Sequence, residues 1–219
     1  MDVTPFVVLK SVRKFFRGVF MIALIDYGVG NLYSVEKAVA SVGGEVLVTN
    51  RIEDLERAEK LILPGVGAFG DCMKNLQATN LIPTIFEQVA KKKFLLGICV
   101  GLQILFESSE ESPDAKGLGI FKGTVKKINA ENLKIPHMGW NSINFNDSKL
   151  FHGINQNSYV YFVHSYQAAP TEKNLISATT NYGEKITASV EFENIFATQF
   201  HPEKSGDVGL QVLKNFCNL

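Results

Sequence analysis

Short apolar runs alternate with helix-like segments in the first part of the chain, and this alternation most constrains the fold. The apolar runs cover residues 22–26, 45–49, 60–63 and 94–98, and the helical segments between them cover 31–42, 51–58, 71–78 and 81–92. Strands that are apolar throughout and alternate with helices are typical of a parallel sheet covered on both faces. The sequence therefore predicts an α/β protein with an open, mostly parallel sheet flanked by helices.

The second part of the chain predicts an antiparallel extension of this sheet. After a polar loop at 108–116, shorter strands are expected at 124–129, 158–163, 175–180, 185–191 and 195–199, and a closing helix at 205–216. Asn181-Tyr182-Gly183 is a candidate hairpin turn. We find no internal repeat or Pro/Ser-rich linker, so residues 21–219 are expected to form one domain. Residues 1–20 mix basic residues with Phe and Val and precede a second methionine, and we expect them to be an extension outside this domain.

Composition narrows the function classes. The chain has 219 residues, 46% hydrophobic and 20% charged, with a formal net charge of zero and no basic stripe, so neither nucleic acid nor a membrane surface is a predicted partner. No apolar run approaches the roughly 20 residues of a membrane span. Its three cysteines are too widely spaced for a disulfide framework or a zinc knuckle, which favours the cytoplasm and predicts no bound metal. A net charge near zero is compatible with an obligate protein partner.

Gly97-Ile98-Cys99-Val100-Gly101 is the most informative local motif. It follows an apolar strand and precedes the helix-like segment 102–106, which is the strand–turn–helix context of a nucleophile elbow with sulfur in place of a serine hydroxyl. Amides that open the following helix would favour a thiolate. The alternative is a buried structural cysteine, and the pentapeptide alone does not decide between them.

A cysteine nucleophile requires a base and a group that orients the base. His201 and Glu203 stand two positions apart after an apolar strand, so both side chains are expected on the same side of the extended chain. His164 is the second candidate base, but no carboxylate lies near it in the sequence. His137 and His152 are more simply explained as structural or interface residues.

An acyl-transfer site also requires amides that stabilise an oxyanion. The Val100 amide, directly after the nucleophile, is the first candidate donor. The loop Pro64-Gly65-Val66-Gly67 follows a neighbouring strand, and its glycines allow the backbone to approach a substrate closely. Gln103, one helical turn after Cys99, is a candidate for binding a polar substrate.

Two motifs in this chain resemble class I glutamine amidotransferases, namely residues 97–103 and the run Phe200-His201-Pro202-Glu203. Four further segments are similar to the glutaminase subunits of imidazole glycerol phosphate synthase, an enzyme of histidine biosynthesis. These segments are 26–32, 63–69, 136–141 and 161–166. The resemblance extends from Met21 to the C-terminus and leaves residues 1–20 outside the family pattern.

The resemblance implies a reaction and the residues that perform it. In that family a cysteine attacks the side-chain amide of glutamine, a glutamyl thioester forms and ammonia leaves, without a cofactor. Cys99 would be the nucleophile, His201 the general base and then the acid, and Glu203 the orienting group. The oxyanion hole and glutamine pocket would be formed by Gly65, Val66, Gly67, Val100, Gln103, Ser165 and Tyr166.

The resemblance also implies a heterodimer. The family's partner is a (β/α)8-barrel cyclase subunit, which receives ammonia through a channel and makes imidazole glycerol phosphate and AICAR from a phosphorylated ribulosyl intermediate. Residues at or near the interface would be Asn31, Ser34, His137, Met138, Trp140, Asn141 and Lys204. Trp140, the only tryptophan, is also the residue type most enriched at binding hot spots, although an ordinary core position is the alternative.

Two other functions are compatible with the same residues. One is a stand-alone thiol hydrolase that acts on a peptide or γ-glutamyl bond, for which activity would not depend on a barrel partner. The other is a non-catalytic regulatory subunit, for which the thiol of Cys99 would be inert. The presence of all three triad residue types favours an enzyme.

Overall fold

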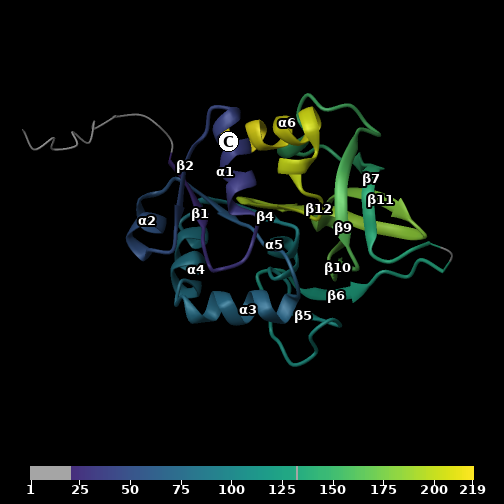
Figure 1. The fold of residues 1–219 in the computed structure, drawn as a ribbon, viewed down its shortest axis with the longest axis horizontal. Helices are drawn as coiled ribbons and strands as arrows, with labels where there is room; N and C mark the ends of the chain where they lie inside the picture. The colour runs from purple at the N-terminus through teal and green to yellow at the C-terminus, as the bar shows by residue number, and fades with distance from the viewer. Residues whose placement is uncertain (1–20, 132) are drawn as a thin grey trace, which may run out of the picture.

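The computed structural model describes residues 21–131 and 133–219, and within them an eight-stranded sheet forms the centre of the molecule (Figure 1). Its order is β2-β1-β3-β4-β13-β12-β11-β8. The five parallel strands are β1 (Met21–Ile25), β2 (Glu45–Thr49), β3 (Lys60–Leu63), β4 (Phe94–Ile98) and β13 (Ile195–Thr198). The antiparallel strands are β12 (Glu184–Phe192), β11 (Ile176–Tyr182) and β8 (Asn144–Phe145). The mostly parallel sheet with an antiparallel extension is confirmed.

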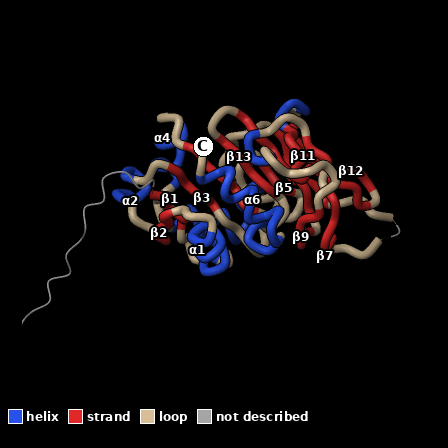
Figure 2. The backbone as a smooth tube through the Cα atoms, turned by 90° about the horizontal axis from the view of Figure 1, so that it is seen from above, coloured by secondary structure: helices blue, strands red, loops and turns tan. Residues whose placement is uncertain are grey.

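Helices cover both faces of the parallel half. Figure 1 and the view from above in Figure 2 place α1 (Leu32–Ser41) and α6 (Gly206–Cys217) together on one side of the sheet. The other side carries α3 (Phe69–Ala78) and α4 (Ile82–Ala90), with α2 (Ile52–Arg57) packed against α4. Because both faces are covered, β3 and β4 are buried almost throughout, which explains their continuous apolar sequence.

Two small sheets stand beside the antiparallel half. One contains β10 (Tyr166–Pro170), β6 (Gly123–Lys127) and β5 (Ser108–Ser109), and the other pairs β7 (His137–Ser142) with β9 (Tyr159–His164). The described part of the chain also contains three short 3₁₀ helices, namely η1 (Lys149–Phe151), η2 (Lys173–Leu175) and η3 (Pro202–Lys204). Strands β5, β7, β8 and β10 were not predicted, and β5 lies in the segment expected to be a polar loop. Among the described residues, every helix falls short of the length and hydropathy that a membrane-spanning helix requires.

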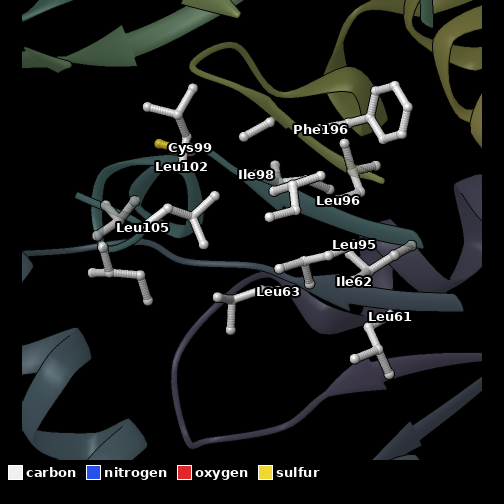
Figure 3. Packing of buried hydrophobic residues seen from close by; sticks show 14 of the residues in the cluster. Leu61, Ile62, Leu63, Leu95, Leu96, Ile98, Cys99, Leu102, Leu105 and Phe196 are labelled. Carbon is white, nitrogen blue, oxygen red and sulfur yellow. The ribbon is translucent and has the colours of Figure 1, made fainter. Parts of the chain in front are cut away.

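The main core lies between the central strands and the helices on either side. Figure 3 shows leucine and isoleucine side chains of β3 and β4 packed with Phe196 of β13, and Cys99 at the edge of this cluster. Burying each such side chain contributes about 1.5–3 kcal/mol relative to leaving it exposed. Cys99 is therefore attached to the packed core of the molecule.

The structure shows one helix cap and the outcome of two local expectations. Asn31 caps α1, since its side-chain oxygen accepts from the Ser34 amide at 3.3 Å. Gly183, with φ of +72°, closes the predicted hairpin between β11 and β12. The expected helix over 102–106 was wrong in its extent, because α5 (Val100–Gln103) ends as the chain tightens into three-residue turns. Residues 1–20, the expected extension, lie outside the described residues.

Candidate active site

Cys99 stands at a sharp turn between β4 and α5, as the elbow motif predicts. Its φ of 56° and ψ of −109° are unusual for a residue other than glycine. Such a conformation costs about 1–3 kcal/mol and persists mainly where function requires it. A Cβ at Gly101 would lie 2.0 Å from the Leu63 carbonyl oxygen, so glycine is required for the turn to pack against β3. The geometry holds a thiol above the end of the sheet and at the start of a short helix.

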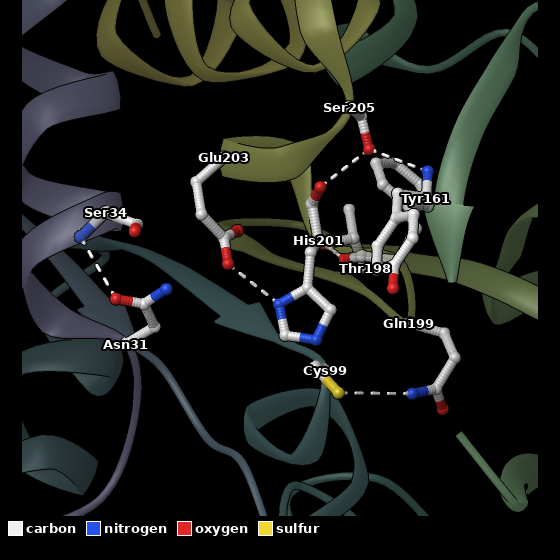
Figure 4. A network of polar contacts seen from close by, with 10 residues as sticks. Asn31, Ser34, Cys99, Tyr161, Thr198, Gln199, His201, Glu203 and Ser205 are labelled. Atoms are coloured by element: carbon white, nitrogen blue, oxygen red, sulfur yellow. Dashed lines mark hydrogen bonds and ion pairs between the residues drawn. The ribbon is translucent and has the colours of Figure 1, made fainter. Parts of the chain in front are cut away.

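The sheet register brings His201 to Cys99. Ile98 pairs with Thr198 at the ends of the adjacent parallel strands β4 and β13. The segments that follow these two strands therefore leave the sheet at the same edge. His201 Nδ1 and Glu203 Oε1 are 2.8 Å apart, and their side chains are 2% and 1% exposed. Figure 4 shows the imidazole between the Glu203 carboxylate and the Cys99 sulfur. The structure thus brings together the three side chains that the sequence analysis expects to act as nucleophile, base and orienting group.

The surroundings of His201 favour its protonated form. Burial lowers the pKa of His201, but the Cys99 side chain and the Glu203 carboxylate together outweigh burial and raise this pKa to about 10. An imidazolium at neutral pH stabilises a thiolate beside it, which is the reactive form of cysteine. The Cys99 side chain and the Glu203 carboxylate therefore hold a charged imidazole beside the sulfur.

Ser205 fixes the backbone that carries the base. Its hydroxyl donates to the His201 carbonyl at 2.6 Å and accepts from the Tyr161 amide at 2.9 Å (Figure 4). The His201 amide in turn donates to the Tyr161 carbonyl at 3.0 Å. These bonds tie η3 to β9 and hold the imidazole in place.

The Val100 amide, which is the expected oxyanion donor, already makes a hydrogen bond within the protein. The Val100 amide donates to the Gly65 carbonyl at 3.3 Å. Within one planar trans peptide the C=O and the next N–H point in opposite directions, so the Val66 amide points away from the Val100 amide. In this conformation the loop presents a carbonyl where a developing negative charge would need donors.

Two side chains hold the peptide groups that flank the Gly65–Val66 peptide. The Tyr27 hydroxyl donates to the Pro64 carbonyl at 2.5 Å, and the Cys72 thiol donates to the Val66 carbonyl at 3.4 Å. Burial raises the pKa of Tyr27 and raises that of Cys72 to about 11, so both remain protonated donors at neutral pH. The Gly65–Val66 peptide is held by its bond to the Val100 amide, while side chains hold the peptides on either side of it.

A pocket of about 690 Å³ opens beside the triad. Its lining includes most of the residues expected to hold glutamine, namely Val66, Gly67, Val100, Gln103, Ser165 and Tyr166. Gln103 itself is buried, and its Nε2 donates to the Tyr166 carbonyl and to Gln199 Oε1, each at 3.1 Å. Gln199 was not singled out from the sequence, because its position beside the sulfur depends on contacts between distant segments.

Both ring nitrogens of His164, the second candidate base, make hydrogen bonds within the protein. Its Nδ1 donates to the Tyr166 carbonyl at 2.8 Å, and its Nε2 lies 2.9 Å from Nδ1 of His137. Burial lowers the pKa of His164 to about 3 and that of His137 to about 4, so both rings are neutral. His137 stacks between Phe162 and Tyr182 below the surface, and His152 is exposed in a loop.

The other expected interface residues lie mainly at the surface. Met138 is 62% exposed and Trp140 is 56% exposed, both on β7, and Lys204 is exposed next to the triad. Trp140 packs edge-on against Tyr161 with ring centroids 6.2 Å apart, so it is a surface residue and not a core residue. Asn31 is exposed, whereas Ser34 and Asn141 are half-buried. In the described part of the chain no cluster of three or more His, Cys, Asp or Glu residues is placed to hold a metal ion.

Comparisons with known proteins show the family of this chain. Residues 23–218 match the family model of class I glutamine amidotransferases. The chain is 50% identical over 203 residues to imidazole glycerol phosphate synthase subunit HisH 1 of Methanococcus maripaludis, covering 91% of this chain and 100% of that protein. It is 46% identical over 204 residues to subunit HisH of Bacillus subtilis, covering 91% of this chain and 96% of that protein.

Solved structures support the fold at lower sequence similarity. The structure described as PurLQS from Thermotoga maritima aligns with a TM-score of 0.69 at 19% identity, covering 90% of this chain and 97% of that chain. A structure described as a glutamine amidotransferase aligns with a TM-score of 0.71 at 18% identity, covering 90% and 99% of the two chains. The chain belongs to the class I glutamine amidotransferase family and, within it, to the HisH subunits of imidazole glycerol phosphate synthase.

Proposed function

We propose that this chain hydrolyses glutamine to glutamate and ammonia at Cys99 and passes the ammonia to a cyclase subunit. The observation that carries this proposal is the buried triad, in which His201 lies between Cys99 and Glu203. Its charged imidazole and strained nucleophile elbow suit acyl transfer through a thioester.

The geometry suggests the order of proton transfers. The Cys99 thiolate attacks the side-chain amide carbon of glutamine, the C–N bond breaks, and His201 gives its proton to the departing ammonia. Water then attacks the thioester and gives a proton to His201, and the C–S bond breaks to release glutamate. Glu203 keeps Nδ1 of His201 protonated, so that Nε2 faces the reacting atoms throughout.

Partner binding would control the oxyanion hole. The Gly65 carbonyl accepts the hydrogen bond of the Val100 amide. Rotation of the Gly65–Val66 peptide would free the Val100 amide and turn the Val66 amide toward the substrate. We expect the isolated chain to hydrolyse glutamine slowly, because one missing oxyanion donor costs about 10²–10³ in kcat. Binding of the cyclase and its ligand would favour the rotated peptide.

The exposed side chains of Met138 and Trp140 provide the docking surface for a (β/α)8-barrel cyclase subunit. Asn31 and Lys204 line the triad pocket, which supports a route for ammonia at this interface. Trp140→Ala should weaken assembly by about 2 kcal/mol or more, as expected of a hot-spot tryptophan. Residues 21–219 form the glutaminase domain in this proposal, and the three free cysteines fit the cytoplasm.

Glutamate release provides the test, measured with and without a cyclase subunit and its acceptor. Cys99→Ala should abolish glutamate release in the assembled enzyme and leave the circular dichroism spectrum unchanged. Cys217→Ala is the matched control, since this cysteine lies at the end of α6, and it should retain full activity. Glutamate production by the Cys99→Ala enzyme, or equal wild-type rates with and without the partner, would contradict the mechanism or its coupling, respectively.

A further inference from the structure

Gln199 is a fully buried side chain that meets the nucleophile. It directly follows β13 and stands two residues before His201, in the bend that leads from the strand to η3. Its Nε2 lies 3.8 Å from Cys99 Sγ, and Figure 4 shows the amide approaching the sulfur from the side opposite Glu203. The backbone N–H of Gln199 donates to the Ala188 carbonyl at 2.8 Å, and this bond fixes the backbone at Gln199.

The direction of the Gln199 amide is determined by its neighbours. The Tyr166 carbonyl can only accept hydrogen bonds, so the Gln103 atom that lies 3.1 Å from it must be the nitrogen. The same nitrogen is 3.1 Å from Gln199, which must therefore present its oxygen to Gln103. The remaining Gln199 atom, the Nε2 donor, faces the sulfur of Cys99.

His164 and His137 continue the same donor-to-acceptor order beyond the Tyr166 carbonyl. His164 Nδ1 also donates to the Tyr166 carbonyl, which leaves His164 Nε2 as the acceptor for His137 Nδ1. The unprotonated Nε2 of His137 then accepts from Asn141 Nδ2 at 3.2 Å. Reversing any one amide or ring in this network would place two donors or two acceptors face to face.

We propose that Gln199 is a catalytic residue that donates a hydrogen bond to the Cys99 thiolate, and that Gln103 is the residue that positions it. This role rests on the proposed function of Cys99 as nucleophile. Neither bond requires a proton to be transferred to or from an amide. The donor supplements the His201 imidazolium before attack and stabilises the same thiolate when it leaves the thioester in the second half of the reaction.

Alkylation of Cys99 by iodoacetamide measures the thiolate directly. Tryptic peptide 94–116 contains Cys99 alone and peptide 61–74 contains Cys72 alone, so mass spectrometry follows each thiol separately. Gln199→Met keeps the side-chain volume and removes the donor. We expect this change to slow Cys99 alkylation about tenfold at pH 6 and to move the half-maximal pH of the reaction up by about one unit, the effect of one hydrogen bond to a charged group.

Gln88→Met is the matched control. Gln88 is also buried, lies in α4, and its Nε2 has no hydrogen-bond partner among the described residues. This change should leave the alkylation profile of Cys99 in place. In the enzyme assembled with its cyclase, Gln199→Met should lower kcat/KM for glutamine about tenfold at pH 6.5, with recovery at higher pH.

Gln103→Met covers the case in which Gln199→Met does not fold. It leaves Gln199 without the group that orients it, and we expect a smaller shift in the same direction, about threefold in alkylation rate. In the unmodified chain, the side-chain ¹H–¹⁵N resonance of one buried glutamine should follow the same pH midpoint as Cys99 alkylation.

Two results would overturn the role of Gln199. One is a folded Gln199→Met chain whose Cys99 alkylation at pH 6 changes by less than about threefold, since a donor to a charged group is worth more than this. The other is a glutamine amide spectrum that is insensitive to Cys99 ionisation. If wild-type Cys99 were no more reactive than buried Cys72, the proposed function itself would fail, which is a separate outcome.

Discussion

Replacing Glu203 by Gln removes one buried charge and nearly conserves shape. In the wild-type chain the carboxylate bonds His201 Nδ1 at 2.8 Å, with both side chains almost completely buried. Together with Cys99, it raises the pKa of His201 to about 10 against the opposing effect of burial. The folded state therefore binds a proton that the unfolded chain releases above pH 6.5.

The sign and size of the effect follow from this difference. A raised histidine pKa stabilises the fold fully below about pH 6.5, and this stability is lost as the pH rises toward about 10. Breaking a buried ion pair costs about 3–5 kcal/mol, and His201 can release its proton to limit that cost. We expect Glu203→Gln to lower the free energy of unfolding by about 3 kcal/mol at pH 6, or roughly 6–12 °C in Tm for a chain of this size.

Urea unfolding followed by circular dichroism between pH 6 and pH 10 measures this difference. The stability deficit of Glu203→Gln should be largest at pH 6 and should shrink as the pH approaches 10. Glu193→Gln is the matched control, because its ion pair with Lys92 is more than half exposed and should contribute at most about 1 kcal/mol. A Glu203→Gln deficit that is constant, or that grows toward pH 10, would refute the charged form of His201 as the source of stability.

Three further predictions concern parts of the fold around the triad. Gly101→Ala should destabilise the chain by about 3 kcal/mol or more and abolish glutamate release, because the new Cβ would lie 2.0 Å from a backbone carbonyl of β3; a chain with wild-type Tm would contradict this. The lowered pKa values of His137 and His164 mean that only the unfolded chain binds their protons below pH 6.5. The free energy of unfolding should therefore fall by up to about 2.7 kcal/mol per pH unit from pH 6.5 toward 4, and a flat profile in urea titrations would count against buried neutral rings. Tyr27→Phe should cost about 1–2 kcal/mol by leaving the Pro64 carbonyl without its donor, and an unchanged Tm in thermal scans would show that this carbonyl finds another partner.

The parallel half of the sheet was predictable because its strands are buried on both faces. Strands β3 and β4 have continuous apolar sequences, and each is followed by glycines that mark its end. Strand β7 was missed because Met138 and Trp140 face solvent and Gly139 lies between them, so neither its composition nor its alternation resembles a strand. It is defined by pairing with β9, which is a contact between distant segments.

The same distinction applies to the site. His201 and Glu203 were predictable as a pair, but the expected extended chain was wrong, because Glu203 lies in η3 and this 3₁₀ turn brings its carboxylate to His201 Nδ1. Gln199 stands in the same run, but its importance depends on Gln103 and on the Tyr166 carbonyl, which come from other elements. The orientation of the Gly65 peptide depends on two backbone torsions that residue identity leaves free.

The position of β13 determines when the site can exist during synthesis of the chain. This strand lies between β4 and β12 in the middle of the sheet, yet it is the last strand to leave the ribosome. Until it arrives, the apolar strand β4 has an open edge, and Cys99 has neither its base nor Gln199. An unfinished chain therefore lacks the proposed triad, and its open β4 edge is free to pair with another chain. Catalytic competence and protection from aggregation are acquired in the same late folding step.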